Sequence, residues 1–291
     1  MARPWLAGAL LTLLAVLPSP APAAAGVRVA LTPRSPRIGD VSLVVVQGIP
    51  DGATLEGSVA GRSLVFFPYA GGAAALAGID FETRPGRYEW KIAVVNGADP
   101  PLVLRGRVTV KGRQFAAERL TLPEGMVELD EETTRRADAE EARLKTLYAT
   151  VTGDRLWRGR FTAPVASPKP PSGFGARRVI NGRPRSPHGG LDYAADRGTP
   201  VVAANAGRVV LVGDFFFPGR LVVVDHGLGV HTAYFHLDRV TVAEQDLVDQ
   251  GQPIGEVGST GRATGPHLHF SASIGSARID PAALLRLNSR D

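Results

Sequence analysis

The sequence of 291 residues predicts a mainly β protein: an immunoglobulin-like β-sandwich, a short helical connector and a C-terminal antiparallel β-rich domain. Three observations favour this fold class. Short runs rich in β-branched and aromatic residues recur along the chain, 34 glycines and 23 prolines provide frequent turns, and only one stretch has a clear helical pattern. The composition, 44% hydrophobic and 21% charged, is that of a globular protein.

Residues 1–25 resemble a secretory signal peptide. Arg3 precedes an apolar run from Trp5 to Leu17, and small residues that suit cleavage end at Ala25. The run is shorter than the roughly 20 residues that span a bilayer, so a membrane anchor is the weaker interpretation. We therefore expect an exported protein of the periplasm or cell envelope, with no stable membrane insertion after cleavage.

The chain contains no cysteine, which excludes disulfides, thiolate metal ligands and a cysteine nucleophile. Any metal must be held by histidine, aspartate or glutamate. With a net charge of +5, the exported protein could bind an anionic wall polymer, a membrane surface or nucleic acid. Because no Lys/Arg run is interleaved with aromatic residues, we do not expect nucleic-acid binding. The oligomeric state cannot be predicted.

Residues 26–113 are predicted to form the immunoglobulin-like sandwich, because short strand-like runs alternate with Gly, Pro, Asn and Asp. Residues 114–158 form the predicted connector. Its helix, expected over 130–151, has acidic residues early and basic residues late, as the helix dipole favours. One face carries apolar side chains and should pack on a neighbour: Ala137, Leu144, Leu147, Tyr148 and Val151.

Residues 159–285 form the predicted β-rich domain, with strand-like runs throughout. All six histidines of the protein lie in it: His188, His226, His231, His236, His267 and His269. In a strand, residues two apart share a face. His267 and His269 in HLHFSAS should therefore share one face, with Leu268 and Phe270 on the other. A surface strand with two solvated histidines is the alternative.

Two further stretches carry candidate site residues. In SPHGGLDYAA, two glycines should let the backbone turn tightly, so that His188 and Asp192 converge. A loop histidine beside a turn-capping aspartate is the alternative. In HTAYFHL, strand parity places His236 with Tyr234 and opposite His231, unless a bulge intervenes. We favour His236 for the site and interpret His226 and His231 as structural or solvated.

Taken together, these motifs resemble the lysostaphin-type (LytM-like) zinc endopeptidases. The resemblance rests on His188–Asp192 (H-x-x-x-D), Tyr234–Leu237 (Tyr-x-His-Leu) and Gly-Pro-His-Leu-His at 265–269, in that order. The segments GTPVVAANAGRVV, DHGLG and GQPIGEVGSTGRATGPHLHF also resemble that family. The similarity covers roughly residues 160–285, under half of the chain.

The resemblance implies a LytM-like peptidase domain with one zinc ion per chain, held by His188, Asp192 and His269. It implies that His236 and His267 are the catalytic histidines. Three protein ligands leave a fourth position for water, whose pKa zinc lowers to about 7. His267 is our candidate for the general base, and His236 would stabilise the oxyanion or assist proton transfer, although the two roles could be exchanged.

The implied substrates are the peptide stems of peptidoglycan, and the implied reaction is hydrolysis of their cross-links. The sequence has neither the H-E-x-x-H motif nor the G-x-S-x-G motif, which argues against helix-borne zinc proteases and serine hydrolases. A non-hydrolytic LytM-like regulator of other wall hydrolases is the alternative function. The presence of all five site residues favours the enzyme.

Overall fold

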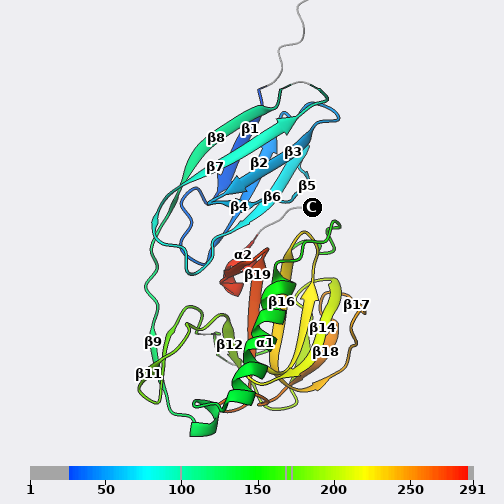
Figure 1. The fold of residues 1–291 in the computed structure, drawn as a ribbon. Helices are drawn as coiled ribbons and strands as arrows, with labels where there is room; N and C mark the ends of the chain where they lie inside the picture. The colour runs from blue at the N-terminus through cyan, green and yellow to red at the C-terminus, as the bar shows by residue number, and fades with distance from the viewer. Residues whose placement is uncertain (1–25, 99, 168, 172, 288–291) are drawn as a thin grey trace, which may run out of the picture.

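The structure, a computed structural model, describes residues 26–287 apart from residues 99, 168 and 172. The predicted signal peptide lies outside the described residues. No helix in the described part of the chain is long and apolar enough to cross a lipid bilayer. Antiparallel sheets dominate, which confirms the prediction of a mainly β protein (Figure 1).

The N-terminal part consists of two four-stranded antiparallel sheets. Buried side chains from both sheets, including Val44, Val46, Ile92 and Val108, form one shared core. The first sheet has the order β1 (Arg28–Thr32), β2 (Val41–Gln47), β6 (Gly72–Gly78), β5 (Phe66–Tyr69). The second has the order β4 (Arg62–Ser63), β3 (Thr54–Val59), β7 (Gly86–Val95), β8 (Leu102–Val110). This order is compatible with an immunoglobulin-like sandwich, which stays a prediction.

The sequence indicated strand-like runs over 27–31, 41–47, 63–69, 87–95 and 103–110, and β3 and β6 lie outside them. β6 reads GAAALAG, which lacks the β-branched and aromatic residues that mark a strand. Its small residues permit a close approach to the C-terminal domain: a Cβ at Gly78 would lie 3.1 Å from Ala277 Cβ and 3.1 Å from Ile274 Cβ. Packing between the domains thus overrides local propensity in this strand.

The connector contains the predicted helix and an additional strand. Helix α1 (Glu131–Tyr148) begins at Asp130, whose carboxylate accepts a hydrogen bond from Thr133 N at 2.7 Å. Before it come β9 (Ala117–Leu120) and the short 3₁₀ helix η1 (Glu124–Met126). β9 pairs in parallel with β10 (Arg177–Ile180), which continues to β11 (Arg183–Pro184).

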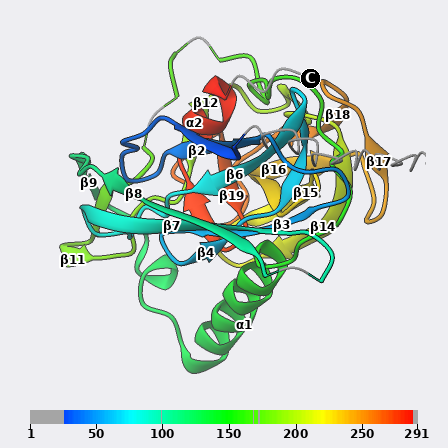
Figure 2. The same cartoon turned by 90° about the horizontal axis from the view of Figure 1, so that it is seen from above.

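The C-terminal part is built on one nine-stranded sheet. Its main order is β12 (Leu191–Ala194), β19 (His267–Ile274), β16 (Val230–Val240), β15 (Gly219–Asp225), β14 (Gly207–Phe215), β17 (Leu247–Val248). β18 (Pro253–Val257) pairs with β16 and with β13 (Pro200–Val202), and β20 (Ala277–Ile279) pairs with β19. α2 (Pro281–Arg286) is the last helix of the described residues. α1 lies across this sheet (Figures 1 and 2).

The two parts share a tightly packed boundary. Val41, Leu76, Leu268 and Ile279, from both parts, belong to one continuous core. Asp280, almost fully buried, accepts a hydrogen bond from Arg113 Nη1 at 2.7 Å across this boundary. The sandwich is therefore fixed to the C-terminal sheet by apolar and ionic contacts together.

Candidate active site

The three predicted metal ligands lie together. β12 pairs with β19 so that Asp192 stands opposite His269, and His188 approaches from the loop before β12. His188 Nε2 lies 2.8 Å from His269 Nδ1 and 3.0 Å from Asp192 Oδ1. His269 Nδ1 lies 2.9 Å from the same oxygen. Three donor atoms therefore face one point.

This donor set fits a zinc ion. Two imidazole nitrogens and one carboxylate oxygen are all good zinc ligands, and all three ligand atoms lie within 4.8 Å of one another. Hydrogen bonds alone would not satisfy all three ligand atoms. These atoms lie within about 3 Å of one another and share the few protons that are available. His188 Nδ1, on the far side of its ring, is buried without a hydrogen-bond partner among the described residues.

Glycine at position 190 permits this convergence through close packing. Neither Gly189 nor Gly190 has a positive φ, so the expected tight turn is not the reason for glycine here. A Cβ at Gly190 would lie 2.7 Å from His269 Nε2 and 2.9 Å from His269 Cε1, closer than atoms pack. A Cβ at Gly189 would meet nothing within 4 Å. Only the second glycine of the motif is sterically required.

Two charged residues behind Asp192, Arg178 and Glu118, help to hold its carboxylate, and no sequence pattern indicated them. Arg178 Nη2 lies 3.3 Å from Asp192 Oδ2, and Arg178 Nε lies 3.1 Å from Glu118 Oε2. Burial raises the pKa of Asp192, but hydrogen bonds from His188 and His269 outweigh it and hold that pKa well below its usual range. Arg178 and Glu118 come from β10 and β9, whose parallel pairing no sequence pattern indicated.

The two predicted catalytic histidines lie beside the cluster. The rings of His236 and His267 are 4.7 Å apart, and His267 Nε2 is 3.9 Å from Asp192 Oδ1. Each ring has its Nδ1 2.8 Å from a backbone carbonyl oxygen, that of Thr260 for His236 and that of Gly265 for His267. Since a carbonyl only accepts, we assign the proton to Nδ1 in both rings. Each neutral imidazole then has a free electron pair on Nε2.

We preferred His236 because Tyr234 should lie beside it on a polar face, and this expectation is wrong. Tyr234 is fully buried on the opposite face of β16, where it contacts Phe270. His236 has a φ of 63°, and the register of β16 shifts against β15 between Tyr234 and Leu237 and against β18 just after Leu237. This bulge turns His236 to the face of His269 and His231. A local backbone irregularity, invisible in the sequence, brings His236 to the site.

Burial controls the protonation of the site histidines. Burial, with the charges of His269 and His267, lowers the pKa of His236 to about 3. Burial also lowers the pKa of His269 to about 4, although Asp192 opposes this shift. Both imidazoles are therefore neutral near pH 7, which is the form that binds a metal or accepts a proton.

The two remaining histidines are structural. His226 and His231 are both fully buried, so the alternative that they are solvated is wrong. His226 Nδ1 donates to Ala206 O, and its Nε2 is joined to the Thr232 hydroxyl, each at 2.8 Å. His231 lies near Asp225 and packs against Tyr148 of α1. Neither touches the metal cluster.

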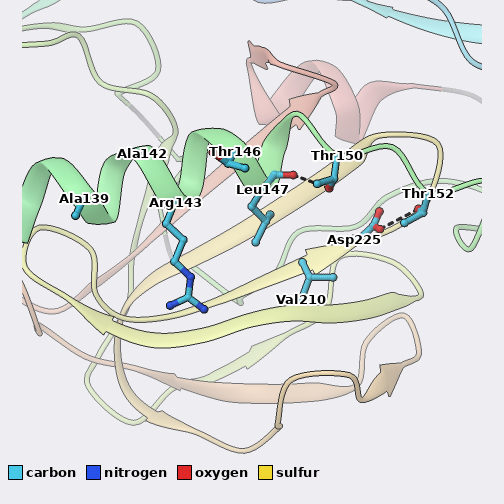
Figure 3. Close-up of a pocket in the computed structure, with 9 residues that line it drawn as sticks. All are labelled: Ala139, Ala142, Arg143, Thr146, Leu147, Thr150, Thr152, Val210 and Asp225. Carbon is cyan, nitrogen blue, oxygen red and sulfur yellow. Dashed lines mark hydrogen bonds between the residues drawn. The ribbon is translucent and has the colours of Figure 1, made fainter.

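A hollow of about 710 Å³ lies between α1 and the sheet, lined among others by Arg143, Thr150, Thr152 and Asp225 (Figure 3). None of the five predicted site residues lines it. α1 nevertheless lies on the sheet face that carries the site. Phe235 stacks on His269 with ring centres 5.1 Å apart, and it packs on the same buried cluster of the sheet as Leu144 and Leu147 of α1.

Comparison with known proteins identifies the domain. Residues 186–281, which include all five predicted site residues, match the family model described as Peptidase family M23. This stretch is a peptidase family M23 domain. The M23 domain confirms the resemblance that the histidine motifs indicated. Arg178 and Glu118 lie outside the matched residues.

Two named relatives of the M23 domain are peptidases. The chain is 39% identical over 111 residues to the peptidoglycan DD-endopeptidase ShyB of Vibrio cholerae, covering 38% of this chain and 26% of ShyB. It is 44% identical over 97 residues to the DD-carboxypeptidase/endopeptidase Mpg of Neisseria meningitidis, covering 33% of this chain and 22% of Mpg. The chain thus matches about a quarter of the length of these relatives.

One solved structure resembles nearly the whole molecule. A candidate M23 peptidase from Pseudomonas aeruginosa superposes with a TM-score of 0.62 at 29% identity. The match covers 86% of this chain and 95% of the other chain. The arrangement of the M23 domain with its N-terminal sheets therefore has a counterpart in another protein.

Proposed function

We propose that this protein is an exported zinc metalloendopeptidase that hydrolyses the peptide cross-links of peptidoglycan. One observation carries the proposal: a three-donor metal cluster and two imidazoles with free Nε2 atoms lie side by side on one sheet face. The name of ShyB supports peptidoglycan as the substrate, and the name of Mpg supports endopeptidase activity. The predicted domain bounds, 26–113, 114–158 and 159–285, and the signal peptide belong to the same proposal.

In this proposal His188, Asp192 and His269 hold one zinc ion per chain, and Arg178 fixes the outer oxygen of Asp192. Bound zinc supplies a Lewis acid and a water molecule whose pKa is lowered to about 7. Arg178 keeps Asp192 Oδ1 turned toward the two histidines, which preserves the donor triangle. Residues that orient ligands in this way typically change metal affinity 10- to 100-fold when removed.

His267 is the proposed general base. Its Nδ1 proton is committed to Gly265 O, and its Nε2 points toward Asp192, so Nε2 is the atom that takes a proton from attacking water. The proton then passes to the amine that leaves the cleaved peptide bond. His236 has the same tautomer through Thr260 O, so it donates from Nε2 only after it has taken a proton. It is suited to assist the transfer to the leaving amine.

The test is loss of cross-links from purified peptidoglycan treated with the protein without residues 1–25, measured as conversion of dimeric to monomeric muropeptides after the glycan strands are digested. We expect conversion with zinc, none with a metal chelator, and recovery when zinc is restored. His188→Ala should lose both bound zinc and conversion, because one of three ligands is missing. Bound zinc at one ion per chain without any conversion would contradict the endopeptidase. That outcome would favour the non-hydrolytic regulator.

A further inference from the structure

His236 has a backbone conformation that residues other than glycine rarely adopt. Its φ of 63° lies in the left-handed region. At this point β15 and β16 are out of step, because Phe235 and His236 together face a single residue, Leu221. Such a conformation persists only where the surrounding structure holds it. The contacts that hold this bulge therefore decide where the imidazole of His236 lies.

Thr260, in the loop between β18 and β19, contacts the bulge through two different atoms. Its carbonyl oxygen accepts the Nδ1 proton of His236 at 2.8 Å. Its hydroxyl donates to the carbonyl oxygen of Leu237, the next residue along β16, at 2.9 Å. Thr260 therefore holds both the ring of His236 and the backbone that follows it.

The same hydroxyl also binds the neighbouring strand. Arg220, which stands opposite Leu237 on β15, donates its backbone N–H to Thr260 Oγ1 at 2.9 Å. A threonine hydroxyl can donate one hydrogen bond and accept others at the same time. The Thr260 hydroxyl thus links a backbone N–H of β15 to a backbone C=O of β16, as a direct hydrogen bond between the strands would.

Glycines on both sides let Thr260 come this close. A Cβ at Gly219 would collide with Thr260 Oγ1, and a Cβ at Gly261 would lie 2.6 Å from Phe217 O. Arg262 fixes the loop on the turn between β14 and β15: its backbone N donates to Phe217 O at 2.9 Å, and its guanidinium carbon lies 3.9 Å from the centre of the Phe217 ring. Thr260 is therefore held against β15 and β16 by its own neighbours.

Removal of the hydroxyl would leave two backbone groups without their shared partner. Leu237 is fully buried, and an unpaired backbone group in a buried place is unfavourable. Direct pairing of Arg220 N with Leu237 O is the nearest replacement, and it would draw the two strands together and alter the bulge. His236 N would keep its bond to Pro218 O, 2.8 Å long, so we expect the sheet to stay folded.

We propose that the Thr260 hydroxyl holds the bulge of β16 and thereby places Nε2 of His236 beside the metal cluster. Thr260 is a positioning residue, because it acts only through His236. The inference rests on the proposed function, in which His236 assists proton transfer to the leaving amine. Such a transfer requires an Nε2 within hydrogen-bond reach of its partner. Loss of the hydroxyl should therefore slow turnover and leave substrate binding nearly intact.

The tautomer of His236 tests this placement without relying on cleavage. We propose ¹⁵N NMR at pH 7 on histidine-labelled protein, with and without zinc. The unaltered protein should carry the proton on Nδ1. Thr260→Val should lose this signature, because His236 moves away from the carbonyl that fixes the proton, whereas Thr260→Ser should keep it. Thr264→Val, at an exposed threonine of the same loop, is the matched control. An unchanged His236 tautomer in Thr260→Val would overturn the proposal.

Kinetics on the zinc-loaded protein gives a second readout. Thr260→Val should lower kcat about 10- to 100-fold, leave KM within a few fold and keep one zinc ion per chain. Thr260→Ser should retain most of the activity. In a His236→Ala background, Thr260→Val should cause no further loss, since its effect passes through His236. An equal loss of kcat in that background, or in Thr260→Ser, would overturn the positioning role.

Thr260→Ala removes the same hydroxyl with a smaller side chain, and it replaces Thr260→Val in both experiments if the valine variant does not fold. The two readouts also separate this inference from the proposed function. Absence of cleavage by every protein, together with the expected change of tautomer in Thr260→Val, would refute the endopeptidase and support the role of Thr260 in placing His236.

Discussion

At the scale of single residues, the same kind of hydrogen bond holds His236 and His267 in one tautomer. In each, a backbone carbonyl accepts the Nδ1 proton and leaves Nε2 free beside the metal cluster. The two carbonyls belong to Thr260 and Gly265, in the same loop. The loop thus fixes both tautomers at once, and we expect its conformation to matter as much as the histidines themselves.

Gly190→Ala tests the close packing beside His269. A methyl group there would collide with the backbone carbonyl of Phe270 and with the His269 ring, so we expect zinc affinity to fall about 10- to 100-fold, the range for residues that orient metal ligands. Competition with a zinc-binding dye measures this. Gly189→Ala is the matched control, because its Cβ would meet nothing within 4 Å. Similar zinc affinity in the two variants would contradict the packing argument.

His226 makes folding sensitive to acid. Burial lowers its pKa from 6.5 to about 4, so the unfolded chain takes up this proton first as the pH falls. The free energy of unfolding that neutral His226 contributes is complete above pH 6.5 and is lost as the pH drops from 6.5 toward 4. Complete loss amounts to about 3 kcal/mol.

Urea unfolding at several pH values measures this contribution. We expect His226→Gln, which cannot be protonated, to show a smaller loss of unfolding free energy between pH 6.5 and 4 than the unaltered protein. The comparison isolates His226, because the other buried histidines titrate in both proteins. Identical pH dependence would show that His226 does not carry the effect.

At the scale of elements, α1 is attached to the hairpin that supports Arg262. Glu140 Oε2 accepts a hydrogen bond from Phe216 N at 2.6 Å, and Glu140 Oε1 pairs with Arg136 at 2.7 Å. Phe216 in turn packs on Phe217, the ring beneath Arg262. Helix, hairpin and active-site loop therefore form one connected unit.

Glu140→Ala should loosen this unit, because Phe216 N loses its charged acceptor. We expect amide hydrogen exchange in residues 214–219 to accelerate about 10-fold or more, as the loss of a charge-assisted hydrogen bond implies. Glu141→Ala, at an exposed position of the same helix, is the control and should leave that exchange unchanged. Unchanged exchange in Glu140→Ala would mean that α1 does not support the hairpin.

At the scale of the whole molecule, the sandwich and the C-terminal sheet share one core and should unfold together. Arg113→Ala removes the ionic partner of the buried Asp280 carboxylate, and we expect it to lower the free energy of unfolding by about 3 kcal/mol. Thermal unfolding followed by both fluorescence and circular dichroism measures this. Arg105→Ala is the control, since Arg105 and its partner Glu89 are both more than half exposed. Two separate transitions in the unaltered protein would contradict a shared core.

The features of the fold and the site that could be predicted from the sequence are those that depend on short-range patterns. Strand periodicity placed His267 and His269 on one face, and the helix was found from its charges and apolar stripe. It missed what depends on contacts between distant segments. β6 is stabilised by packing that its small residues permit, His236 turns through a bulge, and Arg178 reaches Asp192 from another sheet. None of these features has a local signature.

The central claim is that His188, Asp192 and His269 hold the metal while His267 acts on the substrate. Cleavage of a purified cross-linked muropeptide dimer by His267→Ala, on samples of measured zinc content, tests it most directly. We predict one zinc ion per chain with cleavage at least about 100-fold slower than that of the unaltered protein. A variant that keeps its zinc and cleaves at the normal rate, or one that loses its zinc, would contradict the division of roles.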